Sequence, residues 1–116
     1  MLSTPIGPYR PVVRAGEWLA VSGQIPLAEG SIVDGGIPAQ TRQALANLAS
    51  VLGTEGASLA DVVKTTVYLR DMGDFGAMNQ VYAEVFGEHR PARATVAVAG
   101  LPMGALVEID AWAYVG

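Results

Sequence analysis

Arg93 is the residue of this sequence with the clearest potential for chemistry. It follows Pro91-Ala92 and precedes Ala94-Thr95-Val96, so its guanidinium falls within a largely apolar run. A planar guanidinium binds a carboxylate through two parallel hydrogen bonds, which makes a small organic anion one candidate partner. An internal ion pair with Glu108 or Asp110 is the other candidate, and pairing is the usual way to bury a charge. The residues alone leave both open.

Several other residues are weaker candidates, each with a plainer alternative. Glu108 is a candidate general base or water-orienting group, because partial burial raises a carboxyl pKa, but it can equally be a solvated or ion-paired strand residue. Ser22 and Gly23 offer a hydroxyl and an approachable backbone N–H, although a strand end that needs glycine explains them as well. Tyr9 can cover a pocket or pack in a turn, and Asn79 can line a site or support a helix.

The residue types present exclude several kinds of site. The chain has no cysteine, which excludes disulfides, thiolate metal sites and a cysteine nucleophile. Its one histidine, His89, lies between Glu88 and Arg90 and is expected to be solvated, so a multi-histidine zinc site is excluded. We find no nucleophile–base pair, no phosphate-binding glycine loop and no metal-ligand spacing, and therefore expect no metal.

Length and composition favour one domain over residues 1–116 that associates with copies of itself. Hydrophobic residues make up 51% of the chain and charged residues 16%, so some apolar surface is expected to be hidden in an oligomer. The net charge of −4 argues against broad binding to nucleic acid. No apolar run is long enough to span a membrane and the start lacks the pattern of a signal peptide, so we expect a cytoplasmic protein.

Hydrophobic periodicity predicts an α+β fold in the order ββαβαββ, with both helices on one face of a sheet. The expected strands cover 12–15, 18–25, 62–69, 93–98 and 107–115; the expected helices cover 38–53 and the segment between Asp74, as N-cap, and Gly87; a loop covers 28–36. A domain this small cannot cover the second face of its sheet. We expect that face, with Trp18, Ala20, Tyr68 and Trp112, to meet another subunit.

Alternation along the strands predicts which side chains share a face. If the aliphatic residues of the last two strands face the helices, the polar ones gather on the opposite face: Arg93, Thr95, Glu108 and Asp110. The same argument places Gly23 toward the helices and Ser22 away from them. Whether the last two strands pair directly is left open by this pattern.

A series of short segments runs through nearly the whole chain, from Ile6 to Ala113. The segments are Ile6-Gly-Pro-Tyr9, Val21-Ser-Gly-Gln-Ile-Pro26, Gln40-Thr-Arg-Gln43 with Asn47-Leu48, Val62-Val-Lys-Thr-Thr-Val67, Asp71-Met-x-Asp-Phe75, Asn79-x-Val-Tyr82, Pro91-Ala-Arg93 and Leu101-Pro-x-Gly-Ala-Leu-Val-Glu108. Each segment alone is unspecific. In this order and at these spacings, the chain resembles the RidA family, also called the YjgF/UK114 family.

The resemblance implies a chorismate-mutase-like subunit that assembles as a homotrimer, with sites in clefts between subunits and a central strand between the last two strands. The activity it implies is hydrolytic deamination of enamines and 2-imino acids, such as 2-aminoacrylate, to 2-keto acids and ammonia, without cofactor or metal. Other relatives imply a small-carboxylate-binding regulatory protein, or an endoribonuclease and translation inhibitor. The acidic charge and the lack of a basic stripe weigh against RNA cleavage.

Carried over position by position, the resemblance implies a role for each candidate. Arg93 matches the arginine that binds the substrate carboxylate, and Glu108 matches the glutamate associated with the hydrolytic water. The remaining pocket positions are matched by Tyr9 over the pocket, Ser22 and Gly23 in its lining, and Asn79.

Three positions depart from the family pattern. Thr95 stands where relatives often have cysteine, so its backbone N–H and hydroxyl are available but a thiol-dependent role is not expected. Arg10 follows Tyr9 where a small polar residue is common, which places a second cation near the expected pocket rim. Met103 stands in a turn that often carries lysine, and we expect this change to be neutral.

Overall fold

The computed structural model describes residues 5–116. The first four residues, which belong to the N-terminal segment expected to lack a signal peptide, lie outside the described residues. The elements in chain order are β1 (Val12–Ala15), β2 (Trp18–Gln24), β3 (Leu27–Ala28), β4 (Ser31–Ile32), α1 (Gly36–Gly53), β5 (Val62–Leu69), α2 (Phe75–Phe86), β6 (Ala92–Ala97) and β7 (Val107–Tyr114). The predicted order is confirmed, except that β3 and β4 form a small hairpin where a loop was expected.

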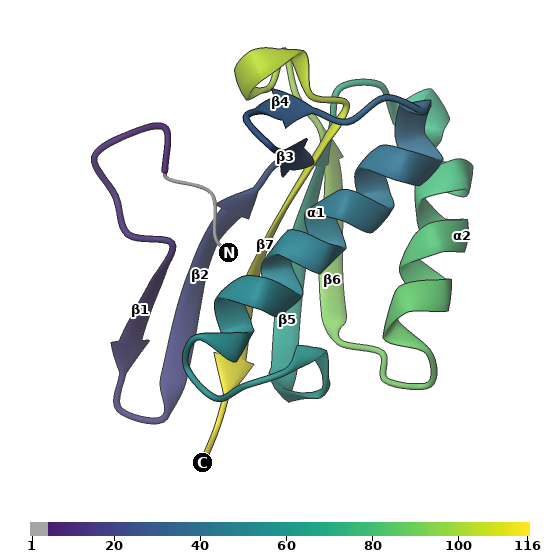
Figure 1. Cartoon of the computed structure of the whole chain (residues 1–116). Helices are drawn as coiled ribbons and strands as arrows, with labels where there is room; N and C mark the ends of the chain where they lie inside the picture. The colour runs from purple at the N-terminus through teal and green to yellow at the C-terminus, as the bar shows by residue number, and fades with distance from the viewer. Residues whose placement is uncertain (1–4) are drawn as a thin grey trace.

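Five of the strands form one mixed sheet in the order β1-β2-β7-β5-β6. Strand β5 pairs in parallel with β6 and antiparallel with β7, so it separates the last two strands, as the resemblance implied. A parallel pair needs a crossover connection, and α2 provides it between β5 and β6. Figure 1 shows α1 and α2 side by side on the same face of the sheet, as predicted. Strand β6 is left at the sheet edge, beside α2.

The core lies between these helices and the sheet. Leu45, Leu48 and Leu52 of α1 are fully buried, as their helical spacing predicted. They pack against the alternating aliphatic residues of the strands, such as Val67 and Ile109. Burial of each such side chain stabilises the fold by about 1.5–3 kcal/mol, so this layer holds the sheet that carries the candidate residues.

The ends of the helices differ in detail from the prediction. Helix α1 begins at Gly36, two residues before Pro38, after Gly35 in the left-handed region at φ 109°. Asp74 does precede α2, but its side chain makes no capping hydrogen bond. Asp71 accepts a hydrogen bond from the Gly73 N–H instead, within the 3₁₀ turn that leads into the helix.

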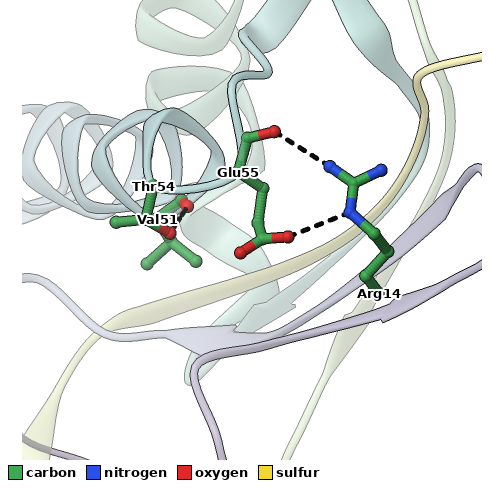
Figure 2. A network of polar contacts seen from close by, with 4 residues as sticks. All are labelled: Arg14, Val51, Thr54 and Glu55. Carbon is green, nitrogen blue, oxygen red and sulfur yellow. Dashed lines mark hydrogen bonds and ion pairs between the residues drawn. The ribbon is translucent and has the colours of Figure 1, made fainter.

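An ion pair ties β1 to the end of α1 (Figure 2). Arg14 Nε donates to Glu55 Oε1 at 3.0 Å, and Arg14 Nη2 donates to the Glu55 carbonyl at 3.0 Å. Thr54 Oγ1 closes the last helical turn by donating to the Val51 carbonyl. The pair is partly exposed, so it contributes at most about 1 kcal/mol, but it fixes the β1 hairpin relative to the helical layer.

The face of the sheet opposite the helices is open and aromatic. Trp18, Trp112 and Tyr114 are 40%, 50% and 41% exposed, and their rings cluster, with the Trp18 centroid 6.4 Å from that of Trp112 and 5.0 Å from that of Tyr114. An exposed apolar patch of this kind is typical of an interaction surface. Oligomer formation itself stays a prediction. Across residues 5–116, no helix has the length and apolar character needed to cross a membrane.

Candidate functional site

Arg93 lies on the helix-facing side of the sheet, not on the open face. Its partner in the parallel register is Thr65, which is fully buried and whose hydroxyl is 2.7 Å from the hydroxyl of Tyr82 on α2. Thr95 is paired with Val67, which is also buried beneath the helices. The side chains of Arg93 and Thr95 therefore point toward α2.

The predicted face of these two residues was wrong because β6 is an edge strand. We expected Ala94 and Val96 to face the helices, yet both are exposed, Val96 by 42%. On an edge strand, the helix-facing side lies beside the flank of α2, where a polar group still reaches solvent. Hydrophobicity alone therefore does not determine which face of β6 is covered.

The guanidinium of Arg93 is held by apolar groups of α2. Its Cζ lies 4.8 Å from the ring centroid of Tyr82 and 5.5 Å from that of Phe75. Its Nη1 is 3.9 Å from Met78 Sδ. Aromatic rings attract a cation without consuming its strong hydrogen-bond donors, so the guanidinium is oriented while its N–H groups stay available.

No carboxylate neutralises this cation among the described residues. The predicted alternative, an ion pair of Arg93 with Glu108 or Asp110, is not formed within the chain. The ion pairs found across residues 5–116 are Arg14–Glu55 and Arg42–Glu84. Of the two interpretations of Arg93 that the sequence left open, the structure is consistent with a site for an external anion.

A hollow of about 320 Å³ opens beside Arg93, between α2 and the start of β6. Its lining residues are Asn79, Tyr82, Ala83, Arg90, Pro91 and Arg93. The Oδ1 atom of Asn79 and the Oγ1 atom of Thr95 are buried and have no hydrogen-bond partner. Buried polar atoms are nearly always hydrogen-bonded, so these two atoms are candidates for a contact with a ligand or a further chain. Thr41 Oγ1, in the fully buried part of α1 away from the hollow, is unpartnered as well. We call Asn79, Arg93 and Thr95 the arginine group.

His89, expected to be solvated, is instead part of the framework next to this hollow. Its Nε2 lies 2.7 Å from the Val62 carbonyl oxygen, and its ring is 6.3 Å from the ring of Phe86. These contacts anchor the connection from α2 to β6 against the beginning of β5. The expectation for His89 was wrong because the chain folds back over the sheet immediately after α2.

A β-bulge in β2 places Ser22 and Gly23 together on the open face. The pairing of β2 with β7 shifts between Val21 and Gln24, so two residues of β2 lie opposite one residue of β7, Asp110. The prediction that Gly23 faces the helices was wrong, because a bulge interrupts the alternation on which it rested. Bulges often occur next to active sites, where they redirect side chains.

Gly23 is in direct contact with the carboxyl group of Glu108. A Cβ atom added to Gly23 would overlap Glu108 Oε2 and lie 2.7 Å from its Cδ, so glycine is required for this approach. Burial raises the pKa of Glu108 above its ordinary value, and the nearby charge of Asp110 raises it further. A carboxyl group with a raised pKa is suited to proton transfer near neutral pH.

The Tyr9 segment runs beside the same bulge. Ser22 Oγ donates to the Arg10 carbonyl at 2.6 Å, and the Ser22 N–H donates to the Pro11 carbonyl at 2.9 Å. Tyr9 itself is 47% exposed. The structure brings Ser22, Gly23 and Glu108 together on the open face, and the Arg10 and Pro11 carbonyls hold the segment that carries Tyr9 beside Ser22. We call Tyr9, Ser22, Gly23 and Glu108 the glutamate group, although no contact of the Tyr9 ring with the other three is observed among the described residues.

Asp110 supports the glutamate group by joining β7 to β5. Its carboxylate accepts hydrogen bonds from the Tyr68 hydroxyl at 3.0 Å and from the Thr66 N–H at 3.2 Å. Burial, and then the hydrogen bond to Asp110, raise the pKa of Tyr68. Asp110 is thus held in place next to Glu108.

The two groups lie on opposite faces of one sheet. Glu108 alternates with Val107 and Ile109, which are fully buried beneath the helices, whereas Arg93 points toward α2. Within a single chain, the sheet separates the Arg93 guanidinium from the Glu108 carboxylate. Each chain therefore carries the two groups of candidate residues apart from one another. Across the described ranges, no three carboxylate or imidazole side chains lie close enough together to hold a metal ion.

The raised pKa of Glu108 predicts a stability effect that depends on pH. The folded chain holds the Glu108 proton more tightly than the unfolded chain, so the free energy of unfolding falls as pH rises from the ordinary pKa of 4.5 through the folded-state pKa. Glu108→Gln, which cannot ionise, is expected to melt at a higher temperature than the wild type at pH 8, with the difference vanishing near pH 4. Calorimetry at both pH values, with the exposed Glu88→Gln as control, measures this. A lower melting temperature for Glu108→Gln at pH 8 would contradict it.

The sequence model of the endoribonuclease L-PSP family matches residues 1–115, nearly the whole chain. The chain belongs to this family. It is the RidA (YjgF/UK114) family to which the ordered motifs pointed, and the resemblance is confirmed.

Relatives and solved structures agree with this membership in the RidA family. A RutC family protein of Pyrococcus horikoshii is 54% identical over 112 residues, which cover 95% of this chain and 89% of the relative. The 2-iminobutanoate/2-iminopropanoate deaminase of Mus musculus is 44% identical over 96% of this chain and 84% of its own. The crystal structure of E. coli TdcF with bound serine has a TM-score of 0.92 and 36% identity, and covers 97% of this chain and 92% of that one.

Four residues around the arginine group were not expected from the sequence. Phe75, Met78 and Tyr82 were assigned only to the apolar stripe of the second helix, although their spacing of three and four residues places them on one helical face. Arg90 was noted only as a neighbour of His89. Its position three residues before Arg93 was the available signal.

Proposed function

We propose that this RidA-family protein hydrolyses 2-imino acids to 2-keto acids and ammonia. The observation that carries the proposal is Arg93, a guanidinium that is oriented by Phe75 and Tyr82, has no carboxylate partner within residues 5–116, and borders a hollow. Named imine deaminases among the relatives and the serine bound to TdcF support a small carboxylate as the ligand.

The proposed reaction needs only positioning and proton transfer. An enamine such as 2-aminoacrylate tautomerises to the 2-imino acid, whose C2 is electrophilic. Water adds to C2, its protons pass to the nitrogen, and the C–N bond breaks to release ammonia and leave the 2-keto acid. Because the imine carbon already accepts a nucleophile, the reaction as proposed requires no cofactor.

The arginine group supplies substrate binding in this proposal. Arg93 receives the carboxylate through two charge-assisted hydrogen bonds. Asn79 Oδ1, a buried acceptor without a partner, accepts the imine N–H, and Thr95 Oγ1 binds the attacking water. The rings of Phe75 and Tyr82 restrict the motion of the guanidinium, which lowers the entropic cost of binding.

The glutamate group supplies proton transfer in this proposal. Glu108, with its raised pKa, takes a proton from the water and returns it to the leaving nitrogen. The backbone N–H of Gly23 donates to the substrate carboxylate or the developing oxyanion. Ser22, whose hydroxyl donates to the Arg10 carbonyl, positions the Tyr9 segment beside the bulge. Tyr9 covers the pocket.

A complete site requires two chains, because the two groups lie on opposite faces of the sheet. We propose that the open face of one subunit meets the β6 edge of the next in a homotrimer with three sites. The exposed Trp18, Trp112 and Tyr114 provide apolar surface for such a contact. A ring of identical contacts places the arginine group of each subunit beside the glutamate group of its neighbour.

Two other functions make different predictions. A regulatory protein would bind a 2-keto acid in the same cleft without accelerating its formation. The family description names an endoribonuclease, but a net charge of −4 and a hollow of about 320 Å³ fit a small anion better than an RNA strand.

The test is to add the protein to a threonine dehydratase and its substrate, and to time the appearance of 2-keto acid with the imine scavenger semicarbazide present. Acceleration proportional to protein concentration supports the deaminase. Binding of 2-oxobutanoate without acceleration supports the regulatory protein. Cleavage of RNA by a nuclease-free preparation, lost in Arg93→Ala, would support the ribonuclease.

Gly23→Ala is expected to reduce kcat for imine hydrolysis at least about tenfold while the fold is retained. The added Cβ would overlap the end of the Glu108 side chain, which is flexible enough to move aside, so the cost falls on proton-transfer geometry more than on stability. Gly53→Ala is the matched control, since nothing lies within 4 Å of its added Cβ. Kinetics and melting temperatures compare the two. Equal kcat for Gly23→Ala and wild type would contradict the role of the Gly23–Glu108 contact.

A further inference from the structure

We propose that the hollow beside Arg93 selects 2-imino acids that carry a second carboxylate, and that Arg90 binds this second group. This inference rests on the proposed deaminase function and names the substrate class for the same site. It assigns a specificity-determining role to a residue that the family resemblance did not single out.

Two guanidinium groups border one small hollow. Arg90 and Arg93 both line it, and they are three residues apart, so their Cα atoms are separated by at most about 10 Å. Pro91 also lines the hollow and limits the backbone freedom of the link between them. A dicarboxylate of four or five carbons has a suitable length to contact two arginine side chains that line one hollow from such positions.

The charged side chains that line this hollow are all positive, although the chain as a whole is acidic. No aspartate or glutamate appears among its lining residues, and neither arginine takes part in an ion pair within residues 5–116. The charges of both cations act on the Tyr82 hydroxyl: burial raises the pKa of Tyr82, while its hydrogen bond with Thr65 and the charges of Arg93 and Arg90 act in the opposite direction. A ligand with two negative charges relieves the repulsion between the two arginines.

The remaining lining suits a short aliphatic chain with an imine nitrogen. The ring of Tyr82 and the methyl group of Ala83 form apolar wall, and Asn79 contributes a buried acceptor without a partner. With the first carboxylate on Arg93 and the imine N–H on Asn79, the far end of the substrate extends toward Arg90. A monocarboxylate of the same length places a methyl group there and leaves Arg90 solvated.

The test measures binding of two matched ligands by titration calorimetry: 2-oxoglutarate and 2-oxopentanoate, which have the same five-carbon chain and differ in the terminal group. Wild type is expected to bind 2-oxoglutarate about fivefold more tightly, a modest factor because Arg90 is exposed. Arg90→Gln is expected to bind both ligands equally, and Arg90→Glu to prefer 2-oxopentanoate. Arg42→Gln is the control, because it makes the same change at an arginine whose ion pair with Glu84 is exposed. It is expected to keep the wild-type preference for 2-oxoglutarate.

The outcomes separate this inference from the proposed function. Equal affinities in wild type, or a preference for 2-oxoglutarate that survives Arg90→Gln, would overturn the role of Arg90 and leave deamination of monocarboxylic imino acids standing. The expected binding pattern without acceleration of imine hydrolysis would overturn the deaminase and keep the dicarboxylate site. Because Arg90 is exposed, its variants are expected to fold, and circular dichroism verifies this.

Discussion

Arg93→Ala is expected to reduce kcat/KM for imine hydrolysis by roughly 100- to 10,000-fold. In the proposed site, the substitution removes two charge-assisted hydrogen bonds to the substrate carboxylate, each worth about 1.5–3 kcal/mol. Arg93→Lys is expected to recover only a small part of the activity, because an ammonium keeps the charge but lacks the planar pair of donors. Timed 2-keto acid formation with an imine generated in situ measures both variants.

The fold is expected to survive the loss of Arg93. Its contacts with Phe75 and Tyr82 are cation–π interactions worth about 0.5–1 kcal/mol each at partly exposed sites, small against the buried layer of leucines. Arg42→Ala provides a control with the same side-chain loss at an exposed ion pair. Circular dichroism and light scattering verify fold and mass. Undiminished turnover by a folded Arg93→Ala protein would refute the proposed mechanism.

Mixing two inactive variants is expected to restore activity if each site is shared between subunits. Arg93→Ala lacks the guanidinium proposed to bind the substrate, and Glu108→Gln lacks the carboxylate proposed to transfer protons, so neither homo-oligomer would have an intact site. In a mixed ring formed from equal amounts, about one site in four receives Arg93 from one subunit and Glu108 from its neighbour. After joint unfolding and refolding, the mixture is expected to show about a quarter of the wild-type rate.

This experiment also tests the assembly directly. Mixing the same proteins without unfolding is the control, since preformed rings exchange subunits slowly and should stay inactive at first. Light scattering of the wild type is expected to give about three times the 12.0 kDa chain mass. Failure to restore activity, with mixed rings demonstrated by mass spectrometry of differently tagged chains, would show that Arg93 and Glu108 do not act in a shared site.

The regular elements were predictable because each depends on local pattern. The leucines at positions 45, 48 and 52 recur at helical spacing, the β-branched run Val62–Leu69 favours a strand, and Gly87 ends α2 at φ 66° as predicted. The identity of the candidate residues followed from motif order, which is also local. Neither the elements nor the identity of the candidate residues depended on knowing which segments lie side by side in the fold.

The faces of the strands were predicted correctly only where alternation is unbroken and the strand is central. Strand β7, between β2 and β5, buries Val107 and Ile109 and leaves Glu108 and Asp110 on the open face, as predicted. Strand β6 lies at the edge, where the side facing α2 accommodates Arg93 and Thr95. In β2, a bulge turns Gly23 to the open face. The sequence pattern of that strand gives no sign that it has one more residue than β7 at this point.

The amino-acid order therefore settled the α+β fold, the succession of its elements and the family, because these depend on periodicity and on motifs that are read along the chain. Only the tertiary structure showed that Arg93 and Glu108 occupy opposite faces of one sheet, and that Arg90 shares a hollow with Arg93. The physical reason is that the environment of a side chain depends on strand order, on bulges and on how much of the sheet a helix covers. Those are set by packing between distant segments, which no local pattern encodes.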